Sequence, residues 1–198
     1  MESQIYSSIA VSFSRTRFSV WKEVQDFLNN LTTNNKILDA GCGNGKNMLY
    51  RKDLDMFGID NCLEFISICQ ERNLNVVWAD ILEIPYANQY FDATMSIAVI
   101  HHLKTFQERC LAIQEIIRVT KKGGKIFIML WQEFGLQSCT KKKITNIGQG
   151  DYLVPFGTCN RFYHICTTEE IEDMMKVIRQ ENYRLDISNG NWNLYIYL

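Results

Sequence analysis

The stretch Asp39-Ala-Gly-Cys-Gly-Asn-Gly-Lys46 constrains the fold of this chain more than any other feature. It follows Lys36-Ile-Leu-Asp39, a short apolar run typical of a buried strand, and it leads into a segment that can begin a helix. Glycines at alternate positions allow positive φ in a tight turn and let backbone amides come close to a ligand. The pattern therefore predicts a strand, a ligand-binding loop and a helix in succession.

Acidic residues also end the next two predicted strands. Asp60 follows the run 54–59, and Asp80 follows the run 74–79. Ligands of parallel sheets bind at the carboxyl ends of the strands, so we expect Asp39, Asp60 and Asp80 to share one site. Asp60 also lies within the roughly 20-residue reach at which a βαβ unit places a carboxylate on a ribose.

Two other kinds of glycine loop do not fit. A dinucleotide fingerprint requires a third small residue in place of Lys46, and a phosphate-binding P-loop requires wider glycine spacing and Ser or Thr after the lysine. A plain tight turn stays open as an alternative. The strand, acid and loop resemble the opening of class I S-adenosylmethionine-dependent methyltransferases. That resemblance implies a cofactor site formed by Asp39, Gly41, Gly43, Asp60, Asp80, Ile81 and Ala98.

Strand and helix patterns alternate along most of the chain. The alternation predicts a Rossmann-like α/β fold of the class I methyltransferase type, in a single domain over residues 1–198. We expect a central, mostly parallel seven-stranded sheet with helices on both faces. A capping box at 167–170 predicts one more helix. The predicted strands are 36–39, 54–59, 74–79, 91–97, 124–131, 183–187 and 192–198, and the other predicted helices are 20–31, 62–72 and 106–119.

The segment 132–161 has no convincing helix or strand pattern. Structureless loops longer than about 12–15 residues are usually lids, binding loops or disordered segments. Its lysines Lys141, Lys142 and Lys143 can simply be solvated. Because the segment follows the fifth predicted strand, above the expected cofactor, we interpret it as a substrate-facing lid.

The bulk composition excludes several classes of protein. A net charge of −1 argues against a general polyanion binder, so any contact with nucleic acid must come from a local patch. Seven cysteines without a CxxC pair argue against a zinc site or a disulfide framework, so we expect no metal and reduced thiols in a cytoplasmic protein. No apolar stretch is long enough to span a membrane, and the first residues lack the layout of a signal peptide.

The fourth predicted strand leads to His101 and His102, above the place of a methyl donor. The Asn/Asp-Pro-Pro-aromatic sequence of enzymes that methylate exocyclic amines is absent there, and so is the Pro-Cys nucleophile of cytosine-carbon enzymes. The expected target is therefore an oxygen or an easily activated carbon. His102 is a candidate catalytic residue because imidazole titrates near neutral pH. A buried cap of the strand end is the alternative for both histidines.

Several motifs resemble the eukaryotic tRNA wobble-uridine carboxymethyl methyltransferases. The N-terminal segment and the late Arg-Phe-Tyr-His are the more specific motifs, whereas the glycine loop and the His-His strand occur in many methyltransferases. The family usually has Trp in place of Phe156 and of Leu103, and it carries a long charged insertion that this chain lacks. The motifs span residues 6–21, 39–46, 96–102, 154–156 and 161–164.

The resemblance implies methyl transfer from S-adenosylmethionine to the carboxylate of 5-carboxymethyluridine at the wobble position of the tRNA anticodon loop. The product is the methyl ester. A carboxylate is ionised at neutral pH and needs no general base, so the main task is positioning. Arg17 and Arg161 are candidates to grip the carboxylate, and a surface or phosphate contact is the alternative for each. Tyr163 and His164 are candidates to hold the uracil or the ribose.

The resemblance also implies a small zinc-binding activator subunit as a partner. The third predicted strand should lie at an edge of the sheet, and Asn75-Val-Val-Trp78 is apolar, without a Pro or Lys to block pairing. Ile66 and Cys69 on the preceding helix could extend this apolar surface.

Two other functions stay open from the sequence. The first is a small-molecule or lipid methyltransferase, for example of quinone precursors, against which the arginines of the N-terminal segment and the lysine-rich lid argue. The second is a catalytically inactive methyltransferase-like subunit, against which the complete set of Asp39, Asp60 and Asp80 argues.

Overall fold

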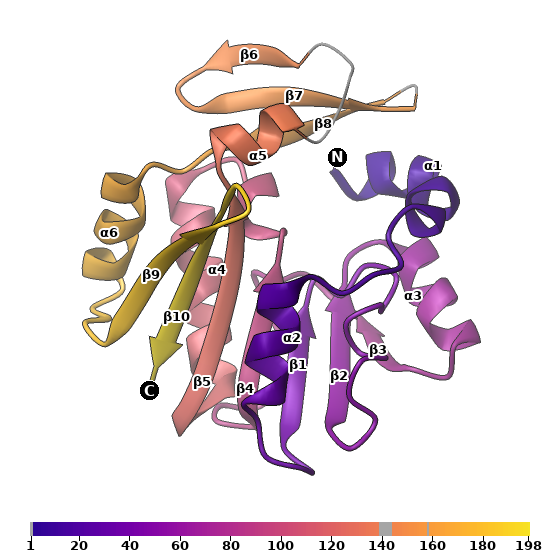
Figure 1. Cartoon of the computed structure of the whole chain (residues 1–198), viewed down its shortest axis with the longest axis vertical. Coiled ribbons are helices and arrows are strands. Elements are labelled where there is room, and N and C mark those ends of the chain that lie inside the picture. Colours follow the sequence, from indigo (N-terminus) through magenta and orange to yellow (C-terminus); the bar gives the residue numbers. More distant parts are fainter. Residues whose placement is uncertain (1, 139–143, 158) are drawn as a thin grey trace.

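The computed structural model describes residues 2–138, 144–157 and 159–198, so the lysines at 141–143 lie outside the described residues. A seven-stranded sheet with the order β3-β2-β1-β4-β5-β10-β9 forms the centre of the molecule (Figure 1). Six of these strands run in the same direction, and β10 runs opposite to them. The predicted mostly parallel sheet is confirmed. Its strands are β1 (Lys36–Ala40), β2 (Asp55–Asp60), β3 (Asn75–Trp78), β4 (Phe91–Ile97), β5 (Thr120–Trp131), β9 (Tyr183–Ser188) and β10 (Asn191–Tyr197).

Helices cover both faces of this sheet, as the sequence predicts. Successive side chains of a strand point to opposite faces. Ile37 therefore packs in the core under α2 (Lys22–Asn29), whereas Leu38 packs in the core under α4 (Phe106–Val119). The helix α3 (Leu63–Glu71) contributes to the first of these cores, and α6 (Thr168–Val177) contributes to the second.

The segment 132–161 contains regular structure, and the expectation of a loop without elements was wrong. It contains the helix α5 (Glu133–Ser138) and most of a second, antiparallel sheet, β6 (Thr145–Gly148), β7 (Asp151–Phe156) and β8 (Cys159–His164). Pro155 obscures the strand pattern, because proline cannot donate to a ladder. It is tolerated because β6 pairs only with residues 151–153 of β7 and so ends before Pro155.

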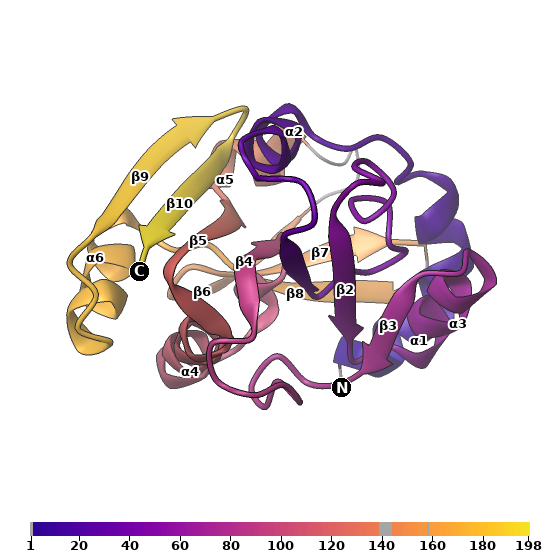
Figure 2. The same ribbon diagram turned by 90° about the horizontal axis from the view of Figure 1, so that it is seen from below.

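The small sheet lies beyond the ends of the main strands, where Figure 1 shows it above them and beside α1 (Glu2–Arg15). Seen from below, β7 and β8 cross the direction of the main strands (Figure 2). Val154 and Tyr163 are buried against Trp131 at the end of β5, which fixes the small sheet to the large one. The sequence pattern of residues 2–15 did not lead us to expect α1. This helix contacts both α3 and β8, and so it connects a helix of the main sheet with the small sheet.

Candidate active site

A cavity opens at the carboxyl edge of the main sheet, between the glycine loop, α1 and β8. Nearly all of the predicted site residues meet there. The cofactor candidates in its lining are Gly41, Gly43, Asp60, Asp80, Ile81 and Ala98, and the substrate candidates are Arg17, His102, Arg161 and Tyr163. Asp39 and His164 are not in the lining.

The glycine loop follows β1 and packs tightly against Val99, which lies just after β4. Gly41 has φ 84°, and a Cβ there would lie 2.3 Å from a methyl carbon of Val99, so no side chain fits. At Gly43, with φ 52°, a Cβ would meet nothing within 4 Å, so the loop is open toward the cavity at this point. Backbone amides at this opening can approach a ligand directly.

Asp60 ends β2 and faces this loop. One carboxylate oxygen accepts a hydrogen bond of 2.8 Å from the Gly43 amide, and the other accepts one of 2.9 Å from the Cys62 amide. Burial raises the pKa of Asp60 to about 6, although these amides favour the ionised form. Each oxygen keeps a further lone pair, so the carboxylate can still accept a hydroxyl donor from a ligand.

Asp39 lies behind the loop, fully buried at the end of β1. Its Oδ2 accepts a hydrogen bond of 3.3 Å from Asn47, a residue that does line the cavity. Its Oδ1 is buried without a hydrogen-bond donor among the described residues. Burial raises the pKa of Asp39 to about 7, against the effects of Asn47 and Lys46. A buried carboxylate of this kind fits a site for a cationic group, which would stabilise its ionised form.

The other cofactor candidates lie around the rim of the same cavity. Asp80 is exposed just beyond β3, where its Oδ1 accepts a hydrogen bond of 3.0 Å from the Leu82 amide. The neighbouring Ile81 is 7% exposed and packs into the core. Ala98 follows β4 with φ 60°, a left-handed conformation that is uncommon for a residue with a Cβ and clusters at functional sites.

Both predicted carboxylate-binding arginines lie against one ring, that of Phe13 in α1. The guanidinium carbon of Arg17 is 5.1 Å from the ring centroid, and that of Arg161 is 5.9 Å from it. Arg161 is 3% exposed and also lies over Phe156 and Tyr163, at 5.2 and 5.1 Å. The two cations are thus brought to the same side of the cavity by aromatic contacts.

Lys46 is a third cation in the cavity lining, and it was not among the site residues expected from the sequence. Its ammonium lies 4.7 Å from the Trp21 ring centroid and donates to the Ser19 carbonyl at 3.0 Å. Burial, and then the charge of Arg17, lower its pKa to about 8. Three cationic side chains around one cavity suit an anionic group on a ligand.

His102 has both ring nitrogens engaged. Nδ1 lies 2.7 Å from the Phe162 carbonyl, which can only accept, so Nδ1 carries the proton. Nε2 therefore accepts from the Tyr6 hydroxyl, 2.9 Å away. Burial, partly offset by the hydrogen bond to Phe162, lowers the pKa of His102 to about 4. The neutral His102 ring therefore links α1 to β8 through both of its nitrogens. Since neither nitrogen is free to exchange a proton with a ligand, His102 is better suited to holding these two elements in position than to proton transfer.

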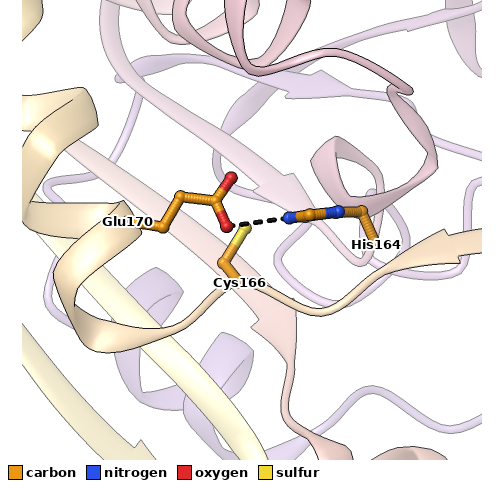
Figure 3. Close-up of side chains that lie close together, drawn as sticks. All are labelled: His164, Cys166 and Glu170. Atoms are coloured by element: carbon orange, nitrogen blue, oxygen red, sulfur yellow. Dashed lines mark hydrogen bonds and ion pairs between the residues drawn. The ribbon is translucent and has the colours of Figure 1, made fainter. Parts of the chain in front are cut away.

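His164 does not reach the uracil or ribose position expected of it. Side chains alternate along β8, so Arg161 and Tyr163 face the cavity and His164 faces away from it. Its Nδ1 lies 2.6 Å from a carboxylate oxygen of Asp151. On the other side of the ring, its Nε2 lies 2.8 Å from Glu170, the contact drawn in Figure 3. Burial alone would lower the pKa of His164, but these two carboxylates raise it above the usual value.

Glu170 extends this group by accepting a hydrogen bond of 2.6 Å from Arg109 of α4. The possible ligand atoms of His164, Cys166 and Glu170 lie within 4.8 Å of one another (Figure 3). Arg109 and both ring nitrogens of His164 face the carboxylates of Glu170 and Asp151, so hydrogen bonding and ion pairing among these side chains account for the group. It ties the small sheet to α4 and α6.

The cysteines within the described residues are free thiols. Among the helices of the described part of the chain, none has the length and apolar character needed to cross a membrane.

Comparisons with known proteins agree with this geometry. A family profile described as a methyltransferase domain matches residues 38–128. A tRNA (carboxymethyluridine(34)-5-O)-methyltransferase from Xenopus tropicalis is 39% identical over 158 residues, which cover 78% of this chain and 25% of that protein. One from Arabidopsis thaliana is 42% identical over 128 residues, which cover 65% of this chain and 32% of that protein. A protein named as a methyltransferase from Encephalitozoon cuniculi is 34% identical over 179 residues, covering 86% and 82%.

The chain belongs to the tRNA carboxymethyluridine methyltransferase family. It spans about a quarter to a third of the length of the Xenopus and Arabidopsis members.

Solved structures agree on the fold. A protein from Pyrococcus horikoshii superposes with a TM-score of 0.74 at 17% identity, covering 93% of this chain and 90% of that one. A methyltransferase from Haloferax volcanii, solved in complex with the Trm112 methyltransferase activator, superposes with a TM-score of 0.68 at 13% identity, covering 99% and 95%. At these identities the likeness establishes the class I methyltransferase fold alone.

Proposed function

We propose that this chain transfers a methyl group from S-adenosylmethionine to the carboxylate of 5-carboxymethyluridine at the wobble position of tRNA. The observation that carries the proposal is the meeting of two groups in one cavity. The acid-lined glycine loop suits the cofactor, and Arg17, Lys46 and Arg161 suit an anionic acceptor. Relatives named for this reaction, at 35–42% identity, support the same assignment.

The cofactor would be held by residues around the glycine loop. Asp60 would accept the ribose hydroxyls, and Asp80 with Ile81 would bind the adenine edge and face. The methionine part would lie along Gly41 and Gly43, with Asp39 stabilising its cationic amino group from behind the loop. When bound, the cofactor supplies an electrophilic methyl group on a sulfonium.

The protein's own contribution to the reaction is orientation. The acceptor carboxylate is already ionised at neutral pH, so no residue needs to remove a proton. A guanidinium that holds one oxygen leaves the other free to attack, whereas a grip on both would weaken the nucleophile. Arg17 is our first candidate for this contact, with Arg161, held in its aromatic surroundings, as the second. The Tyr163 ring, 2% exposed, would form a wall of the uracil pocket.

The small sheet and α1 would enclose the acceptor. His102 joins them, because it accepts a hydrogen bond from Tyr6 of α1 and donates one to the Phe162 carbonyl of β8, and this link favours exclusion of water. We infer that residues 132–161 act as the substrate-facing lid. The long insertion of the family is missing from this chain, so the lid and α1 would carry more of the tRNA contact.

The free edge of β3 supports an activator subunit as partner. Val77 is 39% exposed and Trp78 is 58% exposed, on a strand whose outer side is unpaired within the described residues. An apolar edge of this kind invites strand addition. The Haloferax methyltransferase has a fold similar to that of this chain and was solved with such an activator. We propose that a small zinc-binding activator covers β3, and that the assembly works in the cytoplasm.

The test in cells is mass spectrometry of wobble nucleosides. Cells that lack this protein should accumulate 5-carboxymethyluridine and lose its methyl ester, and the intact gene, but not an Asp60→Ala version, should restore the ester. An unchanged level of the methyl ester in cells without the protein would contradict the proposal.

A further inference from the structure

The loop between α1 and α2 holds one large ring out in solvent. Phe18 is 81% exposed, more than any other large apolar side chain in the part of the chain that the structure describes. It follows Arg17 directly, and Arg17 lines the cavity. Two neighbouring side chains therefore differ in place: Arg17 contributes to the cavity lining, and Phe18 lies in solvent beside it in the chain.

The backbone on both sides of Phe18 is anchored. Three buried or half-buried polar side chains donate hydrogen bonds to carbonyls of this loop, so the ring is exposed on a fixed support rather than on a loose loop. A preorganised aromatic surface loses little freedom when it binds. The bonds run from Asn44 to the Arg17 carbonyl (2.8 Å), from Lys46 to the Ser19 carbonyl (3.0 Å) and from Gln25 to the Val20 carbonyl (2.9 Å).

Three cationic side chains lie in or beside this loop, two of them close to Phe18 in the chain and the third bonded to the carbonyl of Ser19, the next residue. Arg15 is exposed at the end of α1, and Arg17 and Lys46 line the cavity mouth. Among the described residues, none of these three forms an ion pair with a carboxylate. Trp21 supplies a second, half-buried ring that lies against Lys46. An aromatic platform among uncompensated cations is the arrangement that binds single-stranded nucleic acid, through base stacking and phosphate contacts.

We propose that Phe18 is the stacking platform for the base next to the target nucleotide in the RNA strand. With the target base in the cavity beside Arg17, the adjoining base leaves the cavity at the rim, where Phe18 offers its ring. This inference rests on the proposed function and deepens it, because it makes a single-stranded loop, rather than an isolated nucleoside, the preferred substrate. An exposed ring beside cations that have no carboxylate partner suits the bases and phosphates of a nucleic acid strand, so RNA is the partner that the inference takes here.

The test compares wild type, Phe18→Ala and Phe18→Tyr on a tRNA anticodon stem-loop with 5-carboxymethyluridine at the wobble position. The loop carries the fluorescent base 2-aminopurine in the adjoining nucleotide, so stacking quenches its emission. Phe18→Ala should weaken binding of the stem-loop by about fivefold or more and remove the quenching, whereas Phe18→Tyr should keep both. Val177→Ala is the matched control, because Val177 is 58% exposed at the end of α6 and lies outside the cavity lining.

A second arm uses the free nucleoside 5-carboxymethyluridine as acceptor. Its methylation should be equal in wild type and Phe18→Ala, since it has no neighbouring base. Unchanged stem-loop binding and quenching in Phe18→Ala would overturn the inference, and so would an equal loss on the free nucleoside or a loss confined to binding of a protein partner. If wild type quenches the probe through Phe18 but methylates neither acceptor, the proposed function fails while the stacking contact stands.

Discussion

The hydroxyl of Tyr6 donates a hydrogen bond of 2.9 Å to Nε2 of His102, although the two residues are 96 positions apart in the chain. The same imidazole donates from Nδ1 to the Phe162 carbonyl, so one ring connects α1, the end of β4 and β8. Tyr6 also packs edge-on against Phe13, on whose ring both arginines lie. The position of α1 therefore determines the shape of the side of the cavity on which both arginines lie.

Tyr6→Phe should loosen α1 without unfolding the protein. The ring contacts of Tyr6 with Phe13 and Phe65 remain in this variant, and only the hydroxyl is lost. A part-buried hydrogen bond of this kind contributes about 1 kcal/mol. Amide hydrogen exchange in residues 2–15 should become about fivefold faster while exchange in β1 and β4 stays unchanged. If exchange in α1 does not change, the hydrogen bond does not hold the helix in place.

Asp60→Ala should weaken binding of S-adenosylmethionine. It removes a charged acceptor for the ribose and a partner of the Gly43 amide, and hydrogen bonds to charged groups are worth about 1.5–3 kcal/mol. Isothermal calorimetry should therefore show a loss of about tenfold or more in affinity. Equal affinities in the two proteins would remove Asp60 from the cofactor site.

The affinity for S-adenosylmethionine should also depend on pH through Asp60. The pKa of Asp60 is raised to about 6 by burial, so this carboxylate is ionised above that pH and takes up a proton as the pH falls through it. Because the ionised form is the better acceptor, affinity should fall below about pH 6 in wild type. Asp60→Asn should bind more weakly than wild type at neutral pH and show a flatter profile. Asp39 is present in both proteins, but the charge of Asp60 contributes to its raised pKa, so Asp39 should titrate at a lower pH in Asp60→Asn.

Val77→Lys should abolish the association with an activator subunit. A lysine on the outer strand disfavours pairing at a sheet edge. In copurification with a candidate activator, wild type should form a stoichiometric complex and Val77→Lys should not, while both keep the same affinity for S-adenosylmethionine. Ile187→Lys, on the opposite edge strand, is the matched control. A wild-type chain that is fully active alone and unaffected by any activator would contradict the proposed partner.

Arg17→Lys should slow methyl transfer while sparing cofactor binding. Lysine keeps the charge but cannot reproduce the planar two-donor fork of a guanidinium. The single-turnover rate at saturating tRNA should drop tenfold or more, since about 1.36 kcal/mol of lost positioning costs a factor of ten. If Arg17 only contacted phosphate, lysine would serve nearly as well and the defect would be a salt-sensitive loss of tRNA affinity. A normal rate would leave Arg161 as the carboxylate-binding residue.

The main sheet was predictable because its signals are local and repeated. Each of β1, β2 and β3 is a short apolar run followed closely by an acid, and parallel topology then brings Asp60 and Asp80 to one edge without further information. The proposed cofactor side of the cavity, around the glycine loop, follows from the same pattern, apart from Asp39. Its place behind the loop depends on packing of the loop over it, which no spacing rule describes.

The side of the cavity formed by α1 and β8 was harder to predict, because its contacts join parts of the chain that are distant in sequence. Pro155 hides the strand pattern of β7, the central strand of the small sheet. The proline is tolerated because the neighbouring β6 ends before it, and the extent of that pairing cannot be read from the local sequence. The alternation along β8 separates Tyr163 from His164, so two adjacent residues of one motif face opposite ways. Lys46 belongs to the glycine motif, yet only the fold shows that its ammonium reaches the cavity through contact with Trp21.

The most direct test of the account is methylation of a defined acceptor in vitro. The purified chain, with and without a candidate activator, is incubated with S-adenosylmethionine carrying an isotopically labelled methyl group and an anticodon stem-loop containing 5-carboxymethyluridine. Liquid chromatography with mass spectrometry should find the label only on that nucleoside, and mild alkali should release it, as expected of a methyl ester. Label that resists alkali, or that appears equally on a stem-loop with unmodified uridine, would contradict the account.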